Sequence, residues 1–190
     1  FGSLPFLLSD INMSFIHAFF ESTSGITTTG ATVIENLEEN SHGILIWRAL
    51  QQWLGGVGII VMALAVLPML SIGGMQLFKT ESYETPDKVV PKAASFAAGI
   101  SIVYITLTIV WAFMLWGAGM SIFDSIAHAM TTLATGGYST KSESLAAFNS
   151  STIEIIIIFG MLVGSLPFVH YLTLTKNGFR NLIKDYQDKL

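Results

Sequence analysis

The chain has 190 residues, of which 52% are hydrophobic and only 12% are charged, with a mean hydropathy of +0.61. Because an average soluble domain carries about 25% charged residues, this composition excludes an ordinary soluble domain, a disordered chain, a collagen and a coiled coil. The lack of cysteine excludes disulfides and cysteine-based zinc or nucleophile sites, and the net charge of −4 argues against nucleic acid as a partner. We therefore expect an all-α integral membrane protein.

The amino-terminal stretch begins with Phe1 rather than Met and lacks the basic head of a signal peptide. We therefore expect the chain to be an internal piece of a longer protein. Its predicted organisation is a partial first repeat, a cytoplasmic loop, a second repeat and a cytoplasmic tail. These four parts cover residues 1–78, 79–92, 93–175 and 176–190.

The first predicted element is a short apolar helix, Met13–Phe20, followed by the run Thr27-Thr28-Thr29-Gly30-Ala31. A helix of about two turns cannot cross a bilayer, for which roughly 20 apolar residues are needed. A short apolar helix that ends in a Gly-containing extended segment is typical of a re-entrant loop. Such loops are tolerated at membrane depth only when they are buried in protein or line a water-filled path.

Three later stretches are long enough to span a membrane: Ala49–Phe78, Ala93–Phe123 and Ile155–Thr175. Between the second and third lies another short apolar helix, Ser121–Met130, followed by the run Thr135-Gly136-Gly137-Tyr138-Ser139. The predicted order is therefore half-helix with loop, span, polar loop, span, half-helix with loop, span. We expect span–pore loop–span repeats with re-entrant half-helices.

The two Thr/Gly runs align as an internal repeat. An offset of 107 residues places Thr28 on Thr135 and Gly30 on Gly137, whereas an offset of 106 pairs Gly30 with Gly136. Few other positions are identical, so the repeat depends on architecture more than on residue matches. The residues alone leave both offsets open.

The basic residues predict the orientation. Both Thr/Gly loops must lie on one side, together with Arg48 and Lys141, and the other seven of the nine basic residues lie on the opposite side. By the positive-inside rule, that opposite side is cytoplasmic. Most acidic residues share the loop side, and an external mouth of this charge concentrates cations and repels anions. The simpler interpretation, that acidic residues only keep the loops soluble, stays open.

The Thr/Gly runs have the chemistry of a cation filter. A dehydrated monovalent cation needs several oxygens at close range, and backbone carbonyls supply them without a fixed charge that would trap the ion. Glycine allows the backbone angles that such an arrangement requires and leaves the lumen open. Helix caps and turns are the simpler interpretation, but the recurrence after two short helices favours a selectivity filter.

Five stretches carry a family resemblance. They are AFFESTSGITTTGATV at 18–33, WRALQQWLGGVG at 47–58, GMQLFK at 74–79, FDSIAHAMTTLATGGYST at 123–140 and GSLPF at 164–168. In this order they are similar to the first pore loop, the following span, the first cytoplasmic loop, the second pore loop and the next span of one family. That family is the Trk/Ktr/HKT superfamily of potassium transporters, and within it the Trk-type, TrkH-like membrane subunit.

The resemblance implies potassium uptake through a transmembrane pore. The family's filter pattern, Thr-any-Gly, selects Thr28 with Gly30 and Thr135 with Gly137, which favours the offset of 107. Glycine rather than serine at the filter position of both loops implies selectivity for potassium. Family members carry four repeats around one pore, so this chain would supply about half of the filter.

From these arguments we assign roles to the loop residues. Backbone carbonyl coordination is assigned to Thr28, Thr29, Gly30, Thr135, Gly136 and Gly137, with Thr27 beneath them and Tyr138 at the outer rim. The expected K⁺ positions are at Thr28, Gly30, Thr135 and Gly137. Potassium is the transported substrate, and no covalently bound cofactor is expected.

The expected surroundings follow from composition and resemblance. Composition implies membrane lipid as a partner and a multi-pass protein of the plasma (inner) membrane. The resemblance implies contacts with the remaining repeats of the parent chain, a cytoplasmic nucleotide-binding regulatory subunit and a second copy of the protein. We do not expect an enzyme.

Four ionisable residues call for an interpretation. Asp124 and His128 lie four residues apart, and we expect them to belong to the start of the second half-helix and its packing. Glu21, near the end of the first half-helix, is expected to contact a neighbouring loop. We expect Arg48 to be a structural cation paired with an acid such as Glu35 or Glu154, with a smaller role in the field of the outer vestibule.

Two alternatives from other functional classes stay open. A membrane-embedded hydrolase could use Ser24 or Ser125 with His128 and Asp124, provided that the hydroxyl lies within hydrogen-bond reach of the imidazole. A non-conducting scaffold subunit is the other alternative, because half of a pore need not conduct ions alone.

Overall fold

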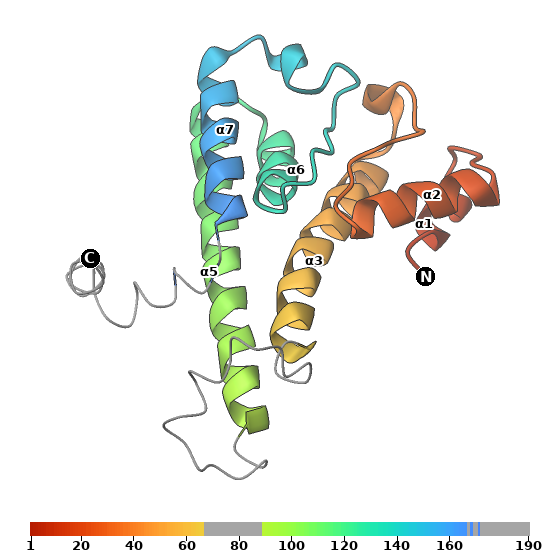
Figure 1. Cartoon of the computed structure of the whole chain (residues 1–190). Coiled ribbons are helices and arrows are strands. Elements are labelled where there is room, and N and C mark those ends of the chain that lie inside the picture. Colours follow the sequence, from red (N-terminus) through yellow and green to blue (C-terminus); the bar gives the residue numbers. More distant parts are fainter. Residues whose placement is uncertain (67–88, 167, 169–170, 172–190) are drawn as a thin grey trace. The chain divides into compact units, whose positions relative to one another are not determined.

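The computed structural model describes residues 1–66, 89–166, 168 and 171, and every regular element in them is helical (Figure 1). In chain order they are α1 (Leu4–Leu8), α2 (Phe15–Ile26), η1 (Leu37–Glu39), α3 (His42–Val66), α5 (Val89–Gly117), α6 (Ile122–Leu133), η3 (Ser144–Phe148) and α7 (Ser151–Ser165). The chain divides into two compact units, residues 1–58 with 106–165 and residues 59–105 with 166–190. The predicted all-α fold is confirmed for the described residues.

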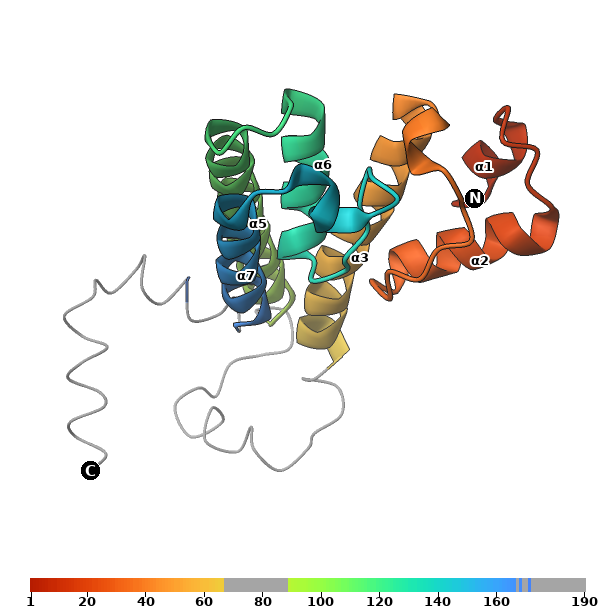
Figure 2. The same ribbon diagram turned by 90° about the horizontal axis from the view of Figure 1, so that it is seen from above.

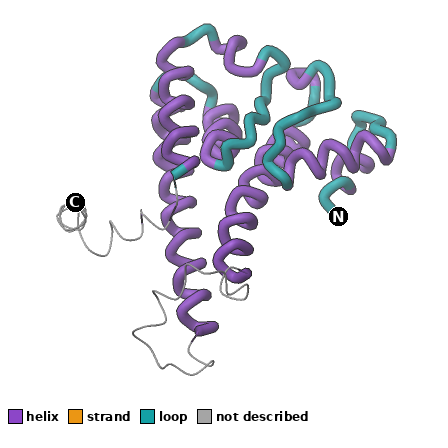
Figure 3. The backbone as a smooth tube through the Cα atoms, viewed as in Figure 1, coloured by secondary structure: helices purple, strands orange, loops and turns teal. Residues whose placement is uncertain are grey.

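The two predicted half-helices are α2 and α6, and each has 12 residues. At 1.5 Å per residue each is about 18 Å long, well short of the roughly 30 Å of a bilayer core. Both run further towards their loops than the apolar pattern predicts. Hydrophobicity stops at Phe20 in α2, whereas the helix ends only where the backbone turns left-handed at Thr28. Figure 3 shows the loops as non-helical segments directly after each half-helix.

Both half-helices begin with the same cap. The hydroxyl of Ser14 accepts a hydrogen bond from the N–H of His17, and that of Ser121 accepts one from the N–H of Asp124. A serine at this position satisfies an amide that otherwise has no partner. The predicted place of Asp124 in the first turn of α6 is confirmed, and its carboxylate there is favoured by the helix dipole.

Helix α7 lies along both α6 and the last turns of α5, as Figures 1 and 2 show from two directions. Gly160 makes this approach close, because a Cβ there would overlap the side chains of Trp111 and Thr132. The Trp111 indole N–H donates to the carbonyl of Ile156 at 3.0 Å. One turn on, a Cβ at Gly164 would lie 2.7 Å from the carbonyl oxygen of Leu133. Two small residues four apart thus let α7 approach the end of α6.

Helix α3 contacts the end of α2 in the equivalent way. A Cβ at Gly55 would overlap the carbonyl oxygen of Ile26, the residue equivalent to Leu133 at the offset of 107. One turn earlier on α3, the Gln51 side chain lies beside Gly25, where an added Cβ would come within 3.0–3.1 Å of two Gln51 atoms. Each pair of helices thus places a glycine against the last turn of its half-helix.

The second unit is described in smaller part. Within it, Tyr104 and Ile100 of α5 are fully buried, and the Tyr104 ring meets the Phe168 ring edge-on with 5.5 Å between centroids. The predicted cytoplasmic tail 176–190 and residues 79–88 of the predicted cytoplasmic loop 79–92 lie outside the described residues. The predicted end of that loop at residue 92 was wrong, because α5 begins at Val89.

Of the three predicted spans, Ala93–Phe123 lies in a described helix, α5, as far as Gly117. Its predicted end at Phe123 was wrong, because α6 already begins at Ile122. Ala97–Gly117, within α5, is a helix of 21 residues long and apolar enough to cross a bilayer. The predicted spans Ala49–Phe78 and Ile155–Thr175 each continue into residues that are not described, so as complete spans they stay predictions.

Candidate functional site

The first loop, residues 27–33, leaves α2 through a tight left-handed turn. Thr28 has φ 56°, its N–H donates to the Gly25 carbonyl, and the N–H of Thr29 donates to the Ser24 carbonyl, both at 3.0 Å. This pair of bonds is the Schellman arrangement, which satisfies the last carbonyls of a helix.

The second loop, residues 134–140, repeats this turn at a spacing of 107 residues. Thr135 has φ 52°, its N–H donates to the Thr132 carbonyl at 3.0 Å, and the N–H of Gly136 donates to the Thr131 carbonyl at 2.9 Å. Each donor and each acceptor of the second turn lies 107 positions after the corresponding residue of the first turn. The backbone therefore follows the offset of 107 rather than 106.

The backbone angles are unusual at two positions of each loop. Gly30 and Gly137 both have φ 81°, and the two β-branched residues Thr28 and Thr135 are also left-handed. A left-handed conformation costs a residue with a Cβ roughly 1–2 kcal/mol. Such conformations gather at functional sites, where the surrounding structure holds them. The hydroxyls of Thr28 and Thr135 make no hydrogen bond within residues 1–66 and 89–166.

The electrostatics of the two turns favour a cation. The amides of Thr28, Thr29, Thr135 and Gly136 are bonded back to the helices, so the loops do not offer these groups to an anion. Both loops also follow the carboxyl end of a helix, where the macrodipole places partial negative charge. The surroundings of both loops therefore suit a cation better than an anion.

The second loop alternates between open and covered residues. Thr135 and Gly137 are exposed, whereas Gly136 and Tyr138 are buried. The carbonyl of Gly136 accepts a hydrogen bond from the Gln52 side chain at 3.0 Å. The predicted ligand role therefore fits the open positions Thr135 and Gly137 better than Gly136.

The two loops touch each other at their glycines. A Cβ at Gly30 would overlap the carbonyl oxygen of Gly136, so glycine is required there by contact as well as by its positive φ. At Gly137 a Cβ would meet nothing within 4 Å. Thr27 and Thr29 differ from these positions, because their hydroxyls bond each other at 2.8 Å and Thr27 also donates to the Thr23 carbonyl.

A buried ion pair lies behind the loops. The Arg48 Nε donates to Glu21 Oε1 at 2.7 Å, and the two side chains are 1% and 0% exposed. The Glu21 carboxylate also accepts bonds from the Thr32 hydroxyl at 2.9 Å and the Val33 N–H at 3.0 Å. The predicted partners Glu35 and Glu154 were wrong, because neither lies on the buried side of the loops, whereas Glu21 does. The prediction that Glu21 contacts a loop is confirmed.

Arg48 and Tyr138 connect this ion pair to the second loop. The guanidinium carbon of Arg48 lies 4.1 Å from the centroid of the Tyr138 ring, and Nη1 donates to the Ser139 carbonyl at 3.1 Å. The Tyr138 hydroxyl donates to the carbonyls of Glu21 and Ala31 at 2.9 and 3.2 Å. The side chain of Tyr138 is therefore buried against the first repeat, and its place at an outer rim stays a prediction.

His128 supports the second loop from the position that Glu21 has in the first repeat. Its Nε2 lies 3.0 Å from the Ser139 hydroxyl and its Nδ1 lies 2.8 Å from the backbone carbonyl of Asp124. The Asp124 carboxylate instead accepts from the hydroxyls of Thr140 and Ser121 at 2.6 and 2.7 Å.

These contacts exclude the hydrolase geometry. The hydroxyl of Ser125 donates to the Ser121 carbonyl and that of Ser24 to the Ala31 carbonyl, both at 2.6 Å, so neither is bonded to His128. The Asp124 carboxylate does not orient the imidazole either. The predicted packing role of Asp124 and His128 is confirmed.

The outer segments of the two repeats meet at Glu38 and Ser142. The Glu38 carboxylate accepts from the Ser142 N–H at 2.8 Å and from its hydroxyl at 2.6 Å, while the Ser142 hydroxyl oxygen accepts from the Leu37 N–H at 2.9 Å. These hydrogen bonds from Ser142 hold the pKa of Glu38 below its ordinary value. Glu35, by contrast, is exposed and lines an open polar hollow with Asp10 and Glu39.

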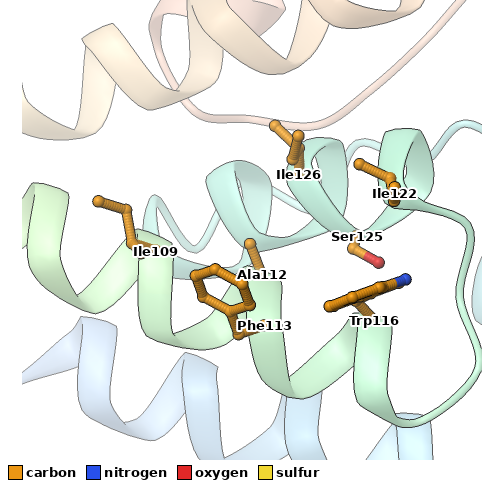
Figure 4. Close-up of a pocket in the computed structure, with 7 residues that line it drawn as sticks. All are labelled: Ile109, Ala112, Phe113, Trp116, Ile122, Ser125 and Ile126. Carbon is orange, nitrogen blue, oxygen red and sulfur yellow. The ribbon is translucent and has the colours of Figure 1, made fainter.

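The two larger of the cavities beside the second half-helix differ in lining. One, of about 160 Å³, is lined by the second loop, by His128 and by Ile157 and Met161 of α7. The other, of about 410 Å³, lies between α5 and α6, where the rings of Phe113 and Trp116 face Ile122 and Ile126 (Figure 4). The single hydroxyl in its lining, from Ser125, is already bonded to a carbonyl, so this second cavity offers no ligand to a cation.

Sequence reasoning missed the role of Gln52. Its side chain is fully buried and bonds two backbone atoms of the second loop, 84 and 86 residues away. The available signal was polarity, because adjacent glutamines at 51 and 52 interrupt an otherwise apolar helix and must find partners when buried.

Comparison with known proteins gives a consistent result. A family model described as "TrkH: Cation transport protein" matches residues 2–190. The chain is 42% identical over 189 residues to the Trk system potassium uptake protein TrkI of Halomonas elongata and 41% identical over 188 residues to TrkH of Escherichia coli K12. These alignments cover 98% and 97% of this chain, but 38% and 39% of the relatives.

A solved structure is also similar. It is the crystal structure of the potassium transporter TrkH from Vibrio parahaemolyticus, with a TM-score of 0.80 and 42% sequence identity. The match covers 93% of this chain and 35% of that chain. The chain thus spans less than two fifths of the length of the curated relatives it matches.

Proposed function

The chain belongs to the TrkH family of cation transport proteins, and from this premise we propose that its two Thr/Gly loops form half of a potassium-selective filter in a transmembrane pore. The observation that carries the proposal is the repeated turn. Two half-helices of equal length end in the same hydrogen bonds, with left-handed threonines and glycines at the same spacing of 107 residues. Neither helix is long enough to cross a membrane.

The proposed ligands are the main-chain carbonyls of Thr28, Gly30, Thr135 and Gly137. Carbonyl dipoles replace the hydration shell of K⁺ without binding it too tightly to leave. The left-handed angles at all four residues support this assignment, since they end the helix, whose carbonyls are bonded internally, and differ from a strand, whose successive carbonyls alternate in direction. Thr29 lies between the two first-loop positions, and its carbonyl belongs to the same proposed filter.

The buried charges support passage of a cation. The positive charge of Arg48 lies behind the loops and is neutralised by Glu21 at 2.7 Å. An unpaired guanidinium at this place would repel K⁺, so the ion pair supplies rigidity without adding a net charge. The names of the relatives, potassium uptake proteins and a potassium transporter, point to the same substrate.

The membrane placement belongs to the proposal as well. Helix Ala97–Gly117 is able to span a bilayer, and many large apolar side chains of α5, α6 and α7 are exposed, among them Phe113, Trp116 and Phe159. Such a surface suits lipid and neighbouring helices. We propose a multi-pass protein of the plasma membrane whose pore is completed by further repeats. A cytoplasmic nucleotide-binding subunit and a second copy stay predictions from the family resemblance.

The test is ion selectivity in the full-length gene product, expressed in bacteria that lack potassium uptake. Gly30→Ser and Gly137→Ser are expected to lower the ratio of K⁺ to Na⁺ uptake, because each alters a glycine with positive φ. Gly58→Ser, on the exposed side of α3 with nothing within 4 Å, is the control. Unchanged selectivity in the first two variants would contradict the filter assignment. A product that accumulates in the membrane and restores no K⁺ uptake would favour the scaffold alternative.

A further inference from the structure

We propose that Gln52 is a positioning residue for ion selectivity, because its side-chain amide fixes the peptide groups on both sides of Gly137. This inference rests on the proposed function, since it assigns a role within the proposed filter. It differs from that proposal in placing a determinant of selectivity on α3, outside both loops.

The geometry is a two-point attachment. Gln52 Nε2 donates to the Gly136 carbonyl at 3.0 Å, and Oε1 accepts from the Tyr138 N–H at 3.1 Å. The side chain of Gln52 is fully buried, so water does not compete for either bond. Gly137 lies between the two attached residues, and a Cβ added to it would meet no atom within 4 Å. Its own orientation is therefore set through its neighbours.

The attachment determines where the Gly137 carbonyl points. In a trans peptide the C=O and the following N–H point in opposite directions. Because the Tyr138 N–H points at Gln52, the carbonyl of Gly137 points away from Gln52. Gly137 is exposed, whereas Gly136 and Tyr138 are buried. Gln52 thus directs a proposed ligand carbonyl to the open side of the loop.

An amide is the side chain that this position requires. The loop presents one acceptor and one donor, and the glutamine amide supplies one of each. A glutamate would keep an acceptor for Tyr138 but lose the donor to Gly136. A leucine of similar size would leave both backbone groups without a partner in a buried place.

The first loop has no such attachment. The atoms equivalent to the Gly136 carbonyl and the Tyr138 N–H are the Thr29 carbonyl and the Ala31 N–H. Neither is bonded by a side chain in the part of the chain that the structure describes. The two bonds of Gln52 are thus a contact that the first repeat makes with the second loop.

The experiment compares two neighbouring glutamines in the full-length gene product. Gln51 is also buried, but its amide bonds the Gly2 carbonyl and the Ser22 hydroxyl at 2.9 and 3.0 Å, both in the first repeat. In Gln52→Leu we expect the ratio of K⁺ to Na⁺ uptake to fall by about threefold to tenfold, the range that corresponds to a typical hydrogen bond. In Gln51→Leu we expect an unchanged ratio, whatever its effect on the amount of protein.

The outcomes separate this inference from the proposed function. If Gln52→Leu keeps the unaltered ratio, or loses K⁺ and Na⁺ uptake in equal proportion, the positioning role is overturned while the proposed function stands. If the unaltered protein takes up no K⁺, both are overturned. If Gln52→Leu does not accumulate, Gln52→Glu compared with Gln51→Glu decides on the same criterion.

Discussion

The first and second loops follow one backbone path, but the side chains that hold them differ in origin and charge. The first loop is held by the Glu21 carboxylate of its own half-helix, through Thr32 and Val33. The second loop is held by His128 and the Asp124 carboxylate of its own half-helix, through Ser139 and Thr140, and in addition by Arg48 and Gln52 of the first repeat. The first repeat therefore supports both loops, whereas the second supports mainly its own.

The equivalent positions Glu21 and His128 show how the difference arises. Each lies on its half-helix at the same offset of 107, and each holds the hydroxyl of an equivalent loop residue, Thr32 or Ser139. A buried carboxylate requires a cation, and Arg48 supplies it. A buried imidazole requires only hydrogen-bond partners. The difference shows that a repeated backbone can keep its geometry with a carboxylate at this position in one copy and an imidazole in the other.

The largest effect is expected from removing the negative charge of Glu21 in the first repeat. Glu21→Gln leaves Arg48 buried without its counter-ion, and we expect it to lower the free energy of unfolding by about 3–5 kcal/mol. His128→Gln, at the equivalent position, should cost only about 1–3 kcal/mol, because it disturbs hydrogen bonds and leaves no charge unpaired. Denaturant unfolding of the purified full-length product in detergent measures both values.

The double variant Glu21→Gln with Arg48→Met is the control for this prediction. It replaces the pair by neutral groups, so most of the lost stability should return. Equal losses in the single and double variants would show that the ion pair is not the reason for the difference between the loops.

A smaller effect is expected from comparing the two filter glycines. Gly137→Ala places a Cβ at φ 81° in open space, and we expect a loss of about 1–2 kcal/mol. Gly30→Ala has the same φ and must also displace the carbonyl of Gly136, so its loss should be larger. Thermal unfolding of the two variants under the same conditions measures the order, and the reverse order would contradict the contact between the loops.

The smallest effect is expected at the hydrogen bonds between Glu38 of the first repeat and Ser142 of the second. The pKa of Glu38 is lowered by its hydrogen bonds with Ser142, so its contribution to stability is present above its ordinary pKa of 4.5. The contribution is lost as the pH falls through the lowered value. Unfolding measured from pH 7 to pH 3 should therefore show a weaker pH dependence in Glu38→Gln than in the unaltered protein. Glu39→Gln, one residue away, should keep the full dependence.

Local features of the sequence predicted the half-helices and their Thr/Gly runs. Helix α6 is an example, because its apolar stretch and its start at Ser121 lie within one segment, although it continues from the predicted end at Met130 to Leu133. The ends of α2 were less predictable, since polar residues from Glu21 to Ser24 continue the helix beyond its apolar part. Glu21 and Ser24 bond residues of the first loop, and Ser22 bonds Gln51 of α3, which no local pattern identifies. Thr23 bonds back to the Phe19 carbonyl within the helix.

The sequence by itself determined an all-helical, membrane-type chain with two short helices, each followed by a run able to turn left-handed, because hydrophobic length and glycine content act over a few neighbouring residues. Only the tertiary structure decided which of thirteen acids pairs with Arg48, and that Gln52 reaches a loop 84 residues away. The physical reason is that a buried polar group must be satisfied, but its partner is chosen by proximity in space. Several acids offered the same charge, and the packing of α2 against α3 brought Glu21 to the guanidinium.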